Sequence, residues 1–329
     1  MRHVLSGVFL TGATLMALTG CSGEGGKPYP DLPGAGRPNI LSTTAMIEDI
    51  VKRVGQEKIT SVCLMRGDVD PHSYEFVKGD DEKLADADVI FHNGVGLECG
   101  ASVRYYLENE EKAVSLGDSV RARFPERLIK VDGIVDPHIW MDPDLFSEIV
   151  DPIVATLTEI DPDNGPFYRK NGLRVKESLK EVDRACFVKL RNIPRDKKYL
   201  VTTHDALRYF VRRYFASEET GGGWEERFAS PNGLAPDGRT SVGDMRRTVD
   251  FLIKNRVSVI FGEANLGTQA LRKIIAICKK KGHTVSLAST PLYGDTLNEE
   301  EGYIRMIEHN VDAIVSHVVE RDEGTGTEG

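Results

Sequence analysis

Cysteine is scarce in this sequence, and its spacing excludes the common metal sites built on thiolates. Only 5 of the 329 residues are cysteine, and no two of them form a Cys-x-x-Cys pair. A structural zinc site made of thiolates usually needs such pairs. The four that follow Cys21 stand singly, and the sequence leaves open whether any two of them form a disulfide: Cys63, Cys99, Cys186 and Cys278.

Long apolar runs and concentrated blocks of one charge are also missing. Beyond residue 21, no stretch reaches the roughly 20 apolar residues that cross a bilayer. The 42 basic and 51 acidic residues give a formal charge of −9 and are interspersed, so there is no basic footprint for nucleic acid. With 40% hydrophobic and 28% charged residues, the composition is that of an ordinary globular protein, long enough for two compact lobes.

The first twenty residues have the pattern of an export signal. A short basic start precedes an apolar stretch, residues 8–18, which is too short to span a membrane. The stretch ends in Leu18-Thr19-Gly20-Cys21, which resembles the lipobox of bacterial lipoproteins. In those proteins the cysteine is acylated and the chain is cleaved just before it. We expect a signal peptide at 1–20, lipidation at Cys21, a flexible tether at 21–38 and a periplasmic protein anchored to the envelope membrane only by its lipid; an ordinary signal peptide is the alternative.

From Asn39 onward, short apolar strands alternate with amphipathic helices. Strands are predicted at 39–43, 59–65, 88–91 and 113–116, with helices between them. This βαβα rhythm indicates a mostly parallel sheet covered by helices. The rhythm restarts at Tyr199, with strands predicted at 199–203, 257–262 and 284–287.

Between these two halves the pattern is helical. A helix is predicted at 145–160, a proline-rich break follows, and a long charged helix with a narrow apolar stripe covers 167–192. The predicted fold class is α/β, with two α/β lobes of mostly parallel sheet joined by a single long helix. We place the N-terminal lobe at 39–164, the connecting helix at 165–194, the C-terminal lobe at 195–320 and a disordered tail at 321–329. The glycine-rich segment 221–239 is predicted to be irregular, and its role is left open.

The tripeptide Asp-Pro-His occurs twice, each time where a strand gives way to a loop. The copies are Asp70-Pro71-His72 and Asp136-Pro137-His138. Proline fixes its own φ and keeps the preceding residue extended, so each histidine follows from a stiff loop. A ligand held in this way loses less entropy when it binds. A capped turn with an exposed histidine would explain one copy, but two copies in comparable loops favour a binding site.

Two more loops carry candidate ligands. His204 follows the strand at 199–203, and Asp295 lies in a late loop. Ligands of open α/β sheets bind at the carboxyl ends of the strands, where two lobes form a cleft. Three imidazoles and one carboxylate suit zinc, iron(II) or manganese(II) better than magnesium or calcium. We predict that one divalent transition metal ion is bound by His72, His138, His204 and Asp295.

Two acidic residues near these loops have more than one interpretation. Glu263 ends an apolar strand and is either an outer partner of a ligand, an alternative ligand, or a hydrogen-bonded carboxylate without a role in binding. Asp205 follows His204 at a junction between strand and helix, where capping of the helix is the better explanation. Trp140 and Tyr293 flank the predicted ligands and are expected to exclude water.

At these residues the chain closely resembles the metal-binding (solute-binding) lipoproteins of bacterial zinc, manganese and iron ABC importers, the TroA/ZnuA-like family, and within it the YtgA type. The likeness runs from about Asn39 to Val315 and includes Asn93-Gly94-Val95-Gly96-Leu97-Glu98. Carried over by position, the family's four ligands fall on the residues predicted above. The resemblance implies a rigid connecting helix, metal in the interlobe cleft and delivery of that metal to an ABC transporter membrane permease. We therefore expect a monomer that is not an enzyme.

Two departures from the family leave the metal open among zinc, manganese and iron. Zinc-specialised members often carry a histidine- and acid-rich loop, which this chain lacks, and manganese-specialised members commonly have Glu where His204 stands.

Two other functions also stay open. One is a metal-dependent hydrolase with Glu263 as general base, although four ligands would close the position that catalytic zinc keeps for water. The other is a metal-independent surface adhesin.

Overall fold

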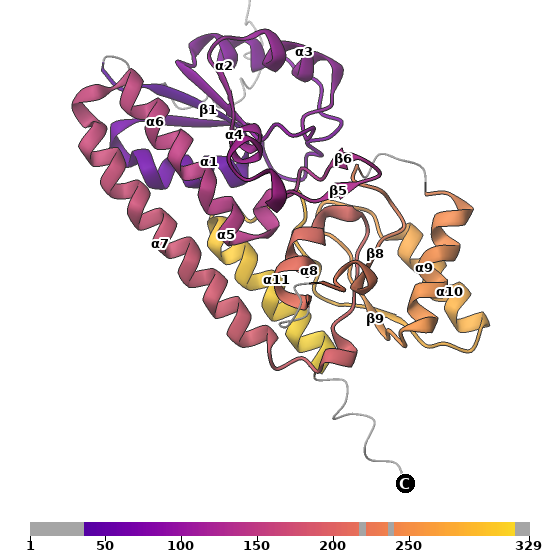
Figure 1. Ribbon diagram of the computed structural model, residues 1–329. Coiled ribbons are helices and arrows are strands. Elements are labelled where there is room, and N and C mark those ends of the chain that lie inside the picture. Colours follow the sequence, from indigo (N-terminus) through magenta and orange to yellow (C-terminus); the bar gives the residue numbers. More distant parts are fainter. Residues whose placement is uncertain (1–35, 217–221, 236–239, 320–329) are drawn as a thin grey trace, which may run out of the picture. The chain divides into compact units, whose positions relative to one another are not determined.

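The computed structural model describes residues 36–216, 222–235 and 240–319 (Figure 1). The predicted signal peptide, Cys21, most of the tether and the tail at 321–329 lie outside the described residues. From Ala35 onward the chain forms one compact unit by its internal contacts. Among the helices that are described, none is long and apolar enough to cross a membrane.

The first half of the chain forms a four-stranded parallel sheet with the order β2-β1-β3-β4. In β1, every residue after Asn39 is buried, as expected of a parallel strand covered on both faces. The strands are β1 (Asn39–Thr44), β2 (Thr60–Met65), β3 (Val89–His92) and β4 (Ala113–Ser115). The helices that accompany them are α1 (Ala45–Gly55), α2 (Asp80–Asp86), α3 (Ala101–Asn109) and α4 (Leu116–Arg123).

The second half holds shorter strands in two parallel pairs. β7 (Leu200–Val201) pairs with β8 (Phe228–Ala229), and β9 (Val259–Ile260) pairs with β10 (Ser286–Leu287). A hydrogen bond of 2.9 Å from the Phe261 amide to the Val201 carbonyl joins the two pairs. The helices of this half are α8 (Arg208–Phe215), α9 (Val242–Lys254), α10 (Gln269–Lys280) and α11 (Gly302–Val319).

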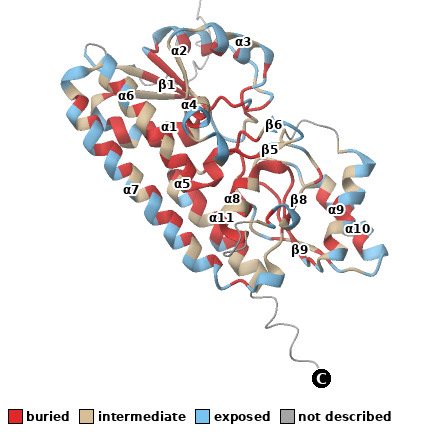
Figure 2. Cartoon of the chain, in the orientation of Figure 1, coloured by how far each residue is buried: buried red, intermediate tan, exposed pale blue. Residues whose placement is uncertain are grey.

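One long helix, α7 (Gly165–Leu190), contacts elements from both halves (Figure 1). Its 26 residues correspond to a length of about 39 Å. It packs against α1, α6 (Val150–Ile160) and α11 through its buried face, and its outer face is exposed (Figure 2). Asp183 on α7 accepts two hydrogen bonds from Arg213 of α8, 2.9 and 2.6 Å. The predicted fold class, α/β with mostly parallel sheet and one long helix, is confirmed.

Several local predictions were wrong, each for an identifiable reason. The helix predicted at 145–160 is divided into α5 (Pro143–Phe146), a 3-10 turn and α6, because Pro152 has no N–H to donate to the carbonyl of Glu148. The strand predicted at 113–116 ends one residue early, where the Ser115 side chain accepts a hydrogen bond from the Asp118 amide and begins α4.

Two further differences from the expected pattern concern short strands. The segment 221–239 was predicted to be irregular, but it supplies β8, the parallel neighbour of β7. The strand before the second Asp-Pro-His belongs to an antiparallel hairpin, β5 (Lys130–Val131) and β6 (Ile134–Val135), and not to a parallel sheet.

Candidate metal centre

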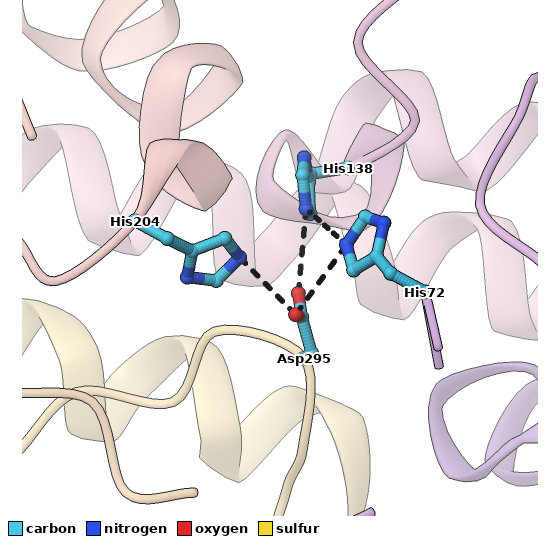
Figure 3. A group of neighbouring side chains, drawn as sticks. All are labelled: His72, His138, His204 and Asp295. Atoms are coloured by element: carbon cyan, nitrogen blue, oxygen red, sulfur yellow. Dashed lines mark hydrogen bonds and ion pairs between the residues drawn. The ribbon is translucent and has the colours of Figure 1, made fainter. Parts of the chain in front are cut away.

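The structure brings the four predicted ligands together, although they come from four separate loops (Figure 3). His72 follows β2, His138 follows β6, His204 follows β7 and Asp295 follows β10. They are exposed by only 4%, 0%, 0% and 5%, respectively. One ligand atom from each of the four lies within 4.8 Å of those of the others.

Asp295 lies at the centre of this group. Its Oδ2 is 3.1 Å from His204 Nε2 and 3.5 Å from His72 Nε2, and its Oδ1 is 3.4 Å from His138 Nε2. The His72 and His138 Nε2 atoms are 3.2 Å apart. Ligands about 2.1 Å from a tetrahedral metal lie about 3.4 Å from each other, so these separations match those around a single ion.

The repeated Asp-Pro-His forms the same turn twice. The carboxylate of Asp70 accepts the His72 amide at 2.9 Å, and that of Asp136 accepts the His138 amide at 3.0 Å. Each aspartate therefore closes a turn over its proline and fixes the backbone of the histidine that follows. In both copies the aspartate thus caps the turn that presents the histidine.

The two copies differ in how they hold the imidazole. Asp136 is fully buried, and its Oδ1 also lies 2.6 Å from His138 Nδ1. The Asp136 carbonyl accepts a hydrogen bond of 2.8 Å from the Tyr209 hydroxyl, which anchors this loop to α8. A carboxylate at Nδ1 keeps the proton on that nitrogen, so Nε2 of His138 is left free for a metal.

Glu263 gives His204 the same support from a different element. Its Oε1 accepts the His204 amide at 2.9 Å, and its Oε2 lies 2.6 Å from His204 Nδ1. A Cβ on the neighbouring Gly294 would lie 2.1 Å from Glu263 Oε2, so only glycine leaves space for this approach. Of the roles open to Glu263, the geometry favours the outer partner of a ligand.

Asp205, next to His204, does not cap the helix as predicted. No side-chain bond caps the turn that begins there. Its carboxylate accepts from Ser230 Oγ at 2.8 Å and from Arg208 Nη2 at 2.7 Å. The bond to Ser230 links the loop of His204 to the segment that carries β8. That segment is therefore connected to the metal site.

The segment from Asn93 to Glu98 supports the second ligand loop. Glu98 is buried and accepts hydrogen bonds from Thr43 Oγ1 at 2.7 Å and from the amides of Asn93 and Gly94 at 2.8 and 3.0 Å. Asn93 then donates 3.0 Å to the carbonyl of Pro137, directly before His138. Residues 93–98 therefore stabilise the loop that carries His138. The sequence pattern alone did not indicate this role.

The loop of Asp295 is held from several sides. Trp140 Nε1 donates 2.9 Å to the Gly294 carbonyl, and the Trp140 ring lies edge-on to the His138 ring at 5.2 Å. Asn310 on α11 exchanges two hydrogen bonds of 2.8 Å with the backbone of Tyr293. The Tyr293 ring itself packs against His309. The Tyr303 hydroxyl donates a hydrogen bond of 2.6 Å to the Trp140 carbonyl. No sequence motif indicated a role for Asn310 or Tyr303 near the site.

The charges at the site depend on each other. Burial lowers the pKa of His138, but the carboxylates of Asp136 and Asp295 outweigh it and raise the pKa to about 9. Burial also opposes the charged form of His204, yet Glu263 and Asp295 hold its pKa well above the ordinary value. Against its own burial, the imidazoles, His204 foremost, hold the pKa of Asp295 well below its usual range. The carboxylates thus create a strong preference for positive charge at this point.

Several buried donor atoms at the site lack a protein partner. Among the described residues, His204 Nε2 and both carboxylate oxygens of Asp295 have no hydrogen bond of normal geometry. The same is true of His204 Nδ1 and Glu263 Oε2, which form a close ion-pair contact of 2.6 Å with each other. Buried polar atoms are almost always satisfied, so unsatisfied atoms that converge on one point indicate a missing partner. Nitrogen and oxygen atoms arranged in this way fit a transition metal cation.

Comparison with known proteins identifies the family. The family model described as zinc-uptake complex component A, periplasmic (ZnuA), matches residues 40–317. The chain belongs to this family. It is 36% identical over 319 residues to the metal-binding protein YtgA of Chlamydia muridarum, covering 96% of this chain and 95% of that protein. The manganese-binding lipoprotein MntA of Bacillus subtilis is 28% identical, with 91% and 94% covered.

Solved structures of the family share the fold. The Fe(III)-bound YtgA of Chlamydia trachomatis matches with a TM-score of 0.81 and 36% identity, covering 86% of this chain and 98% of that chain. The periplasmic zinc-binding protein TroA of Treponema pallidum matches with a TM-score of 0.77 and 26% identity over 86% and 99% of the two chains. The predicted resemblance to the TroA/ZnuA-like family and its YtgA type is therefore confirmed.

None of the other histidines and cysteines in the described part of the chain joins the group of four candidate ligands. His283 contacts the Val257 carbonyl at 2.8 Å and His309 contacts the Pro291 carbonyl at 2.9 Å, as expected of packing residues. None of the four described cysteines forms a disulfide: Cys63, Cys186 and Cys278 are buried, and Cys99 is exposed.

The partner role of Glu263 leads to a test. Glu263→Gln is expected to lower metal affinity about 10- to 100-fold, because a neutral amide no longer holds the proton on His204 Nδ1. Isothermal titration calorimetry measures the change. Asp205→Asn is the matched control, since that buried carboxylate adjoins His204 in sequence and bonds Arg208 and Ser230. An equal loss in both variants would mean that general disturbance of the loop, and not the contact with the imidazole, determines affinity.

Proposed function

We propose that this protein captures one divalent transition metal ion with His72, His138, His204 and Asp295 and delivers it to an ABC-type membrane permease. The observation that carries the proposal is the convergence of four buried side chains on one point, with ligand atoms of two of them, His204 and Asp295, lacking a hydrogen-bond partner. Members of the family supply the metal-binding component of such importers. The ion is the transported ligand, so the protein must bind it tightly and still release it.

The same proposal includes the setting in which the protein acts. We infer a periplasmic monomer, cleaved before Cys21 and held to the envelope membrane by a lipid on that cysteine. We also infer that 39–164 and 195–320 act as two lobes, with 165–194 as the rigid connection. The support is the lipobox-like sequence and a long helix that contacts α1 and α11 from opposite ends of the chain.

The donor set restricts the metal without selecting one. Three imidazole nitrogens with one carboxylate suit zinc, iron or manganese, and these are the metals named for the TroA, YtgA and MntA relatives. Asp295 directs both oxygens into the site, so a fifth bond is available for an ion that prefers a higher coordination number. Intrinsic affinity for the divalent ions is expected to increase in the order manganese, iron, zinc.

A hydrolytic function has less support. Glu263 would be the general base, but its two carboxylate oxygens lie against the amide and Nδ1 of His204. Four protein ligands also leave no open position of the kind that catalytic zinc keeps for water. We therefore propose that the protein is not an enzyme.

The test is metal binding measured in two ways. Calorimetry with zinc, iron(II) or manganese(II) is expected to give one ion per chain. At an ion concentration about 1,000 times Kd, binding is expected to stabilise the folded state by about 4 kcal/mol, measured as a rise in the thermal midpoint. His138→Ala is expected to remove most of both effects. A metal-independent adhesin would show neither binding nor a change in the thermal midpoint.

A further inference from the structure

The outer face of α10 is strongly basic. This helix has four cationic side chains and no acidic one, in the sequence QALRKIIAICKK. Leu271, Ile274 and Cys278 are buried against the body of the protein. The four cations are all exposed, and at 100° per residue they fall within an arc of about 120° on the opposite side: Arg272, Lys273, Lys279 and Lys280. Ile277, which is 36% exposed, lies beside them.

The end of α9 extends this surface. Lys254 in the last turn of α9 and Arg256 just beyond it are exposed. An ion pair of 3.2 Å between Lys281 and Asp250 shows that the carboxyl-terminal ends of α9 and α10 lie close together. We call the six residues without such a carboxylate partner the basic face: Lys254, Arg256, Arg272, Lys273, Lys279 and Lys280.

This concentration contradicts the even mixing of charge expected from the sequence. Residues 242–283 contain nine basic and three acidic residues in a chain whose formal charge is −9. One of the three acids, Glu263, is buried at the metal site. The other two, Asp244 and Asp250, pair with Arg247, Arg246 and Lys281. No described carboxylate lies within ion-pair distance of the basic face.

Helix stability does not explain the arrangement. Cations near a helix C-terminus are favourable, which accounts for Lys279 and Lys280. Arg272 and Lys273, however, lie near the start of α10, where the helix dipole favours acidic residues. Exposed charges of one sign also repel each other within one helix. An external anionic partner would offset this repulsion.

We propose that the basic face binds the anionic lipid headgroups of the membrane to which the protein is anchored. A basic amphipathic helix with an exposed apolar residue among its cations is typical of membrane surfaces. Five of the nine cations of 242–283 are lysine, which acts as a mobile point charge and suits a diffuse anionic surface better than a rigid hydrogen-bonded site. The 15 residues from Cys21 to Ala35 span at most about 50 Å, so an anchor at Cys21 keeps the body near the bilayer.

Most of the basic face lies away from the metal ligands. Arg256 precedes β9 and Lys279 and Lys280 precede β10, whereas Glu263 and Asp295 follow those strands. The carboxyl-terminal ends of α9 and α10 are therefore at the amino-terminal edge of this parallel pair, and the metal ligands are at the opposite edge. Four of the six cations therefore lie at the edge opposite the metal ligands, whereas Arg272 and Lys273, near the start of α10, lie on the outer face of that helix nearer the ligand edge.

Vesicle binding of the polypeptide without its acyl chain tests the proposal independently of Cys21. Residues 22–329 contain the whole compact unit and are incubated with vesicles of phosphatidylcholine, with or without about 40% phosphatidylglycerol. Co-sedimentation at about 50 mM NaCl is expected to be at least about tenfold stronger with the anionic vesicles, and at about 0.5 M NaCl the difference should disappear. Lys273→Glu combined with Lys280→Glu should abolish the preference.

The control makes the same change of charge elsewhere. Lys170→Glu combined with Lys180→Glu alters two exposed residues of α7 and is expected to retain the preference for anionic vesicles. Equal loss in the two double variants, or equal binding to both kinds of vesicle, would overturn the proposal. The proposal would also be overturned if the protein bound only to neutral vesicles that carry the permease. The partner of the basic face would then be an acidic protein surface. Metal binding is measured on the same samples, so that a failure of lipid binding can be distinguished from a failure of the proposed metal-binding function.

Discussion

Asp295→Asn is expected to lower metal affinity by at least about 100-fold. This carboxylate is the one anionic member of the four-residue group, and it lies 3.1 to 3.5 Å from all three imidazoles. Loss of a residue that only supports a ligand typically costs 10- to 100-fold, so removal of the central charged donor should reach or exceed the upper end of that range. Competition against a chromophoric chelator measures the dissociation constant.

A buried aspartate away from the ligands provides the matched control. Asp80 is fully buried and accepts hydrogen bonds from Tyr74 and from the Val77 amide, 2.7 and 2.9 Å. Asp80→Asn should reduce stability but leave affinity within about threefold of the unaltered protein, because its bonds are local to the start of α2. If Asp295→Asn bound metal as tightly as this control, Asp295 would not be a ligand.

Trp140→Ala is expected to destabilise the folded protein by about 3 to 5 kcal/mol. The side chain is 1% exposed and is among the largest fully buried groups of the core. It also connects three parts of the chain, because it packs on His138, donates to Gly294 and accepts at its carbonyl from Tyr303. Metal affinity should decrease as well, since the loop that carries Asp295 loses an attachment. Chemical denaturation measures the free energy of unfolding.

Trp140→Phe separates packing from hydrogen bonding. Phenylalanine retains much of the buried volume but cannot donate to the Gly294 carbonyl, so the expected cost is about 1 to 3 kcal/mol. Because the lost bond is next to Asp295, this variant should lose metal affinity out of proportion to its small loss of stability. Unchanged affinity in Trp140→Phe would show that the bond to Gly294 does not position the ligand.

Two of the four candidate ligands, His72 and His138, were predictable from a local signature. In both Asp-Pro-His copies, proline stiffens the backbone and the aspartate accepts the amide of the histidine two residues later. These effects act within three residues, so the sequence contains all the information that they need. The α/β class was predictable for a similar reason, since alternating short apolar strands and amphipathic helices persist along most of the chain.

Which ligand each distant partner supports was not predictable, even for Glu263, which the sequence had already suggested as an outer partner. Glu263 reaches His204 across 59 residues, and Gly294 permits that approach only because it has no Cβ. Asn93 supports His138 by a bond to Pro137, 44 residues away. Such contacts depend on how loops from different strands meet, and their residue types have many other uses in proteins.

The sequence by itself indicated two candidate ligands and the α/β class, because stiff local turns and hydrophobic periodicity are properties of short segments, and the resemblance to the family added His204 and Asp295. Only the tertiary structure decided that the four donors converge, that Asp136 and Glu263 direct the imidazoles inward, and that six cations gather on α9 and α10. Distances between side chains on separate elements follow from packing, and a metal site and a charged surface both depend on those distances.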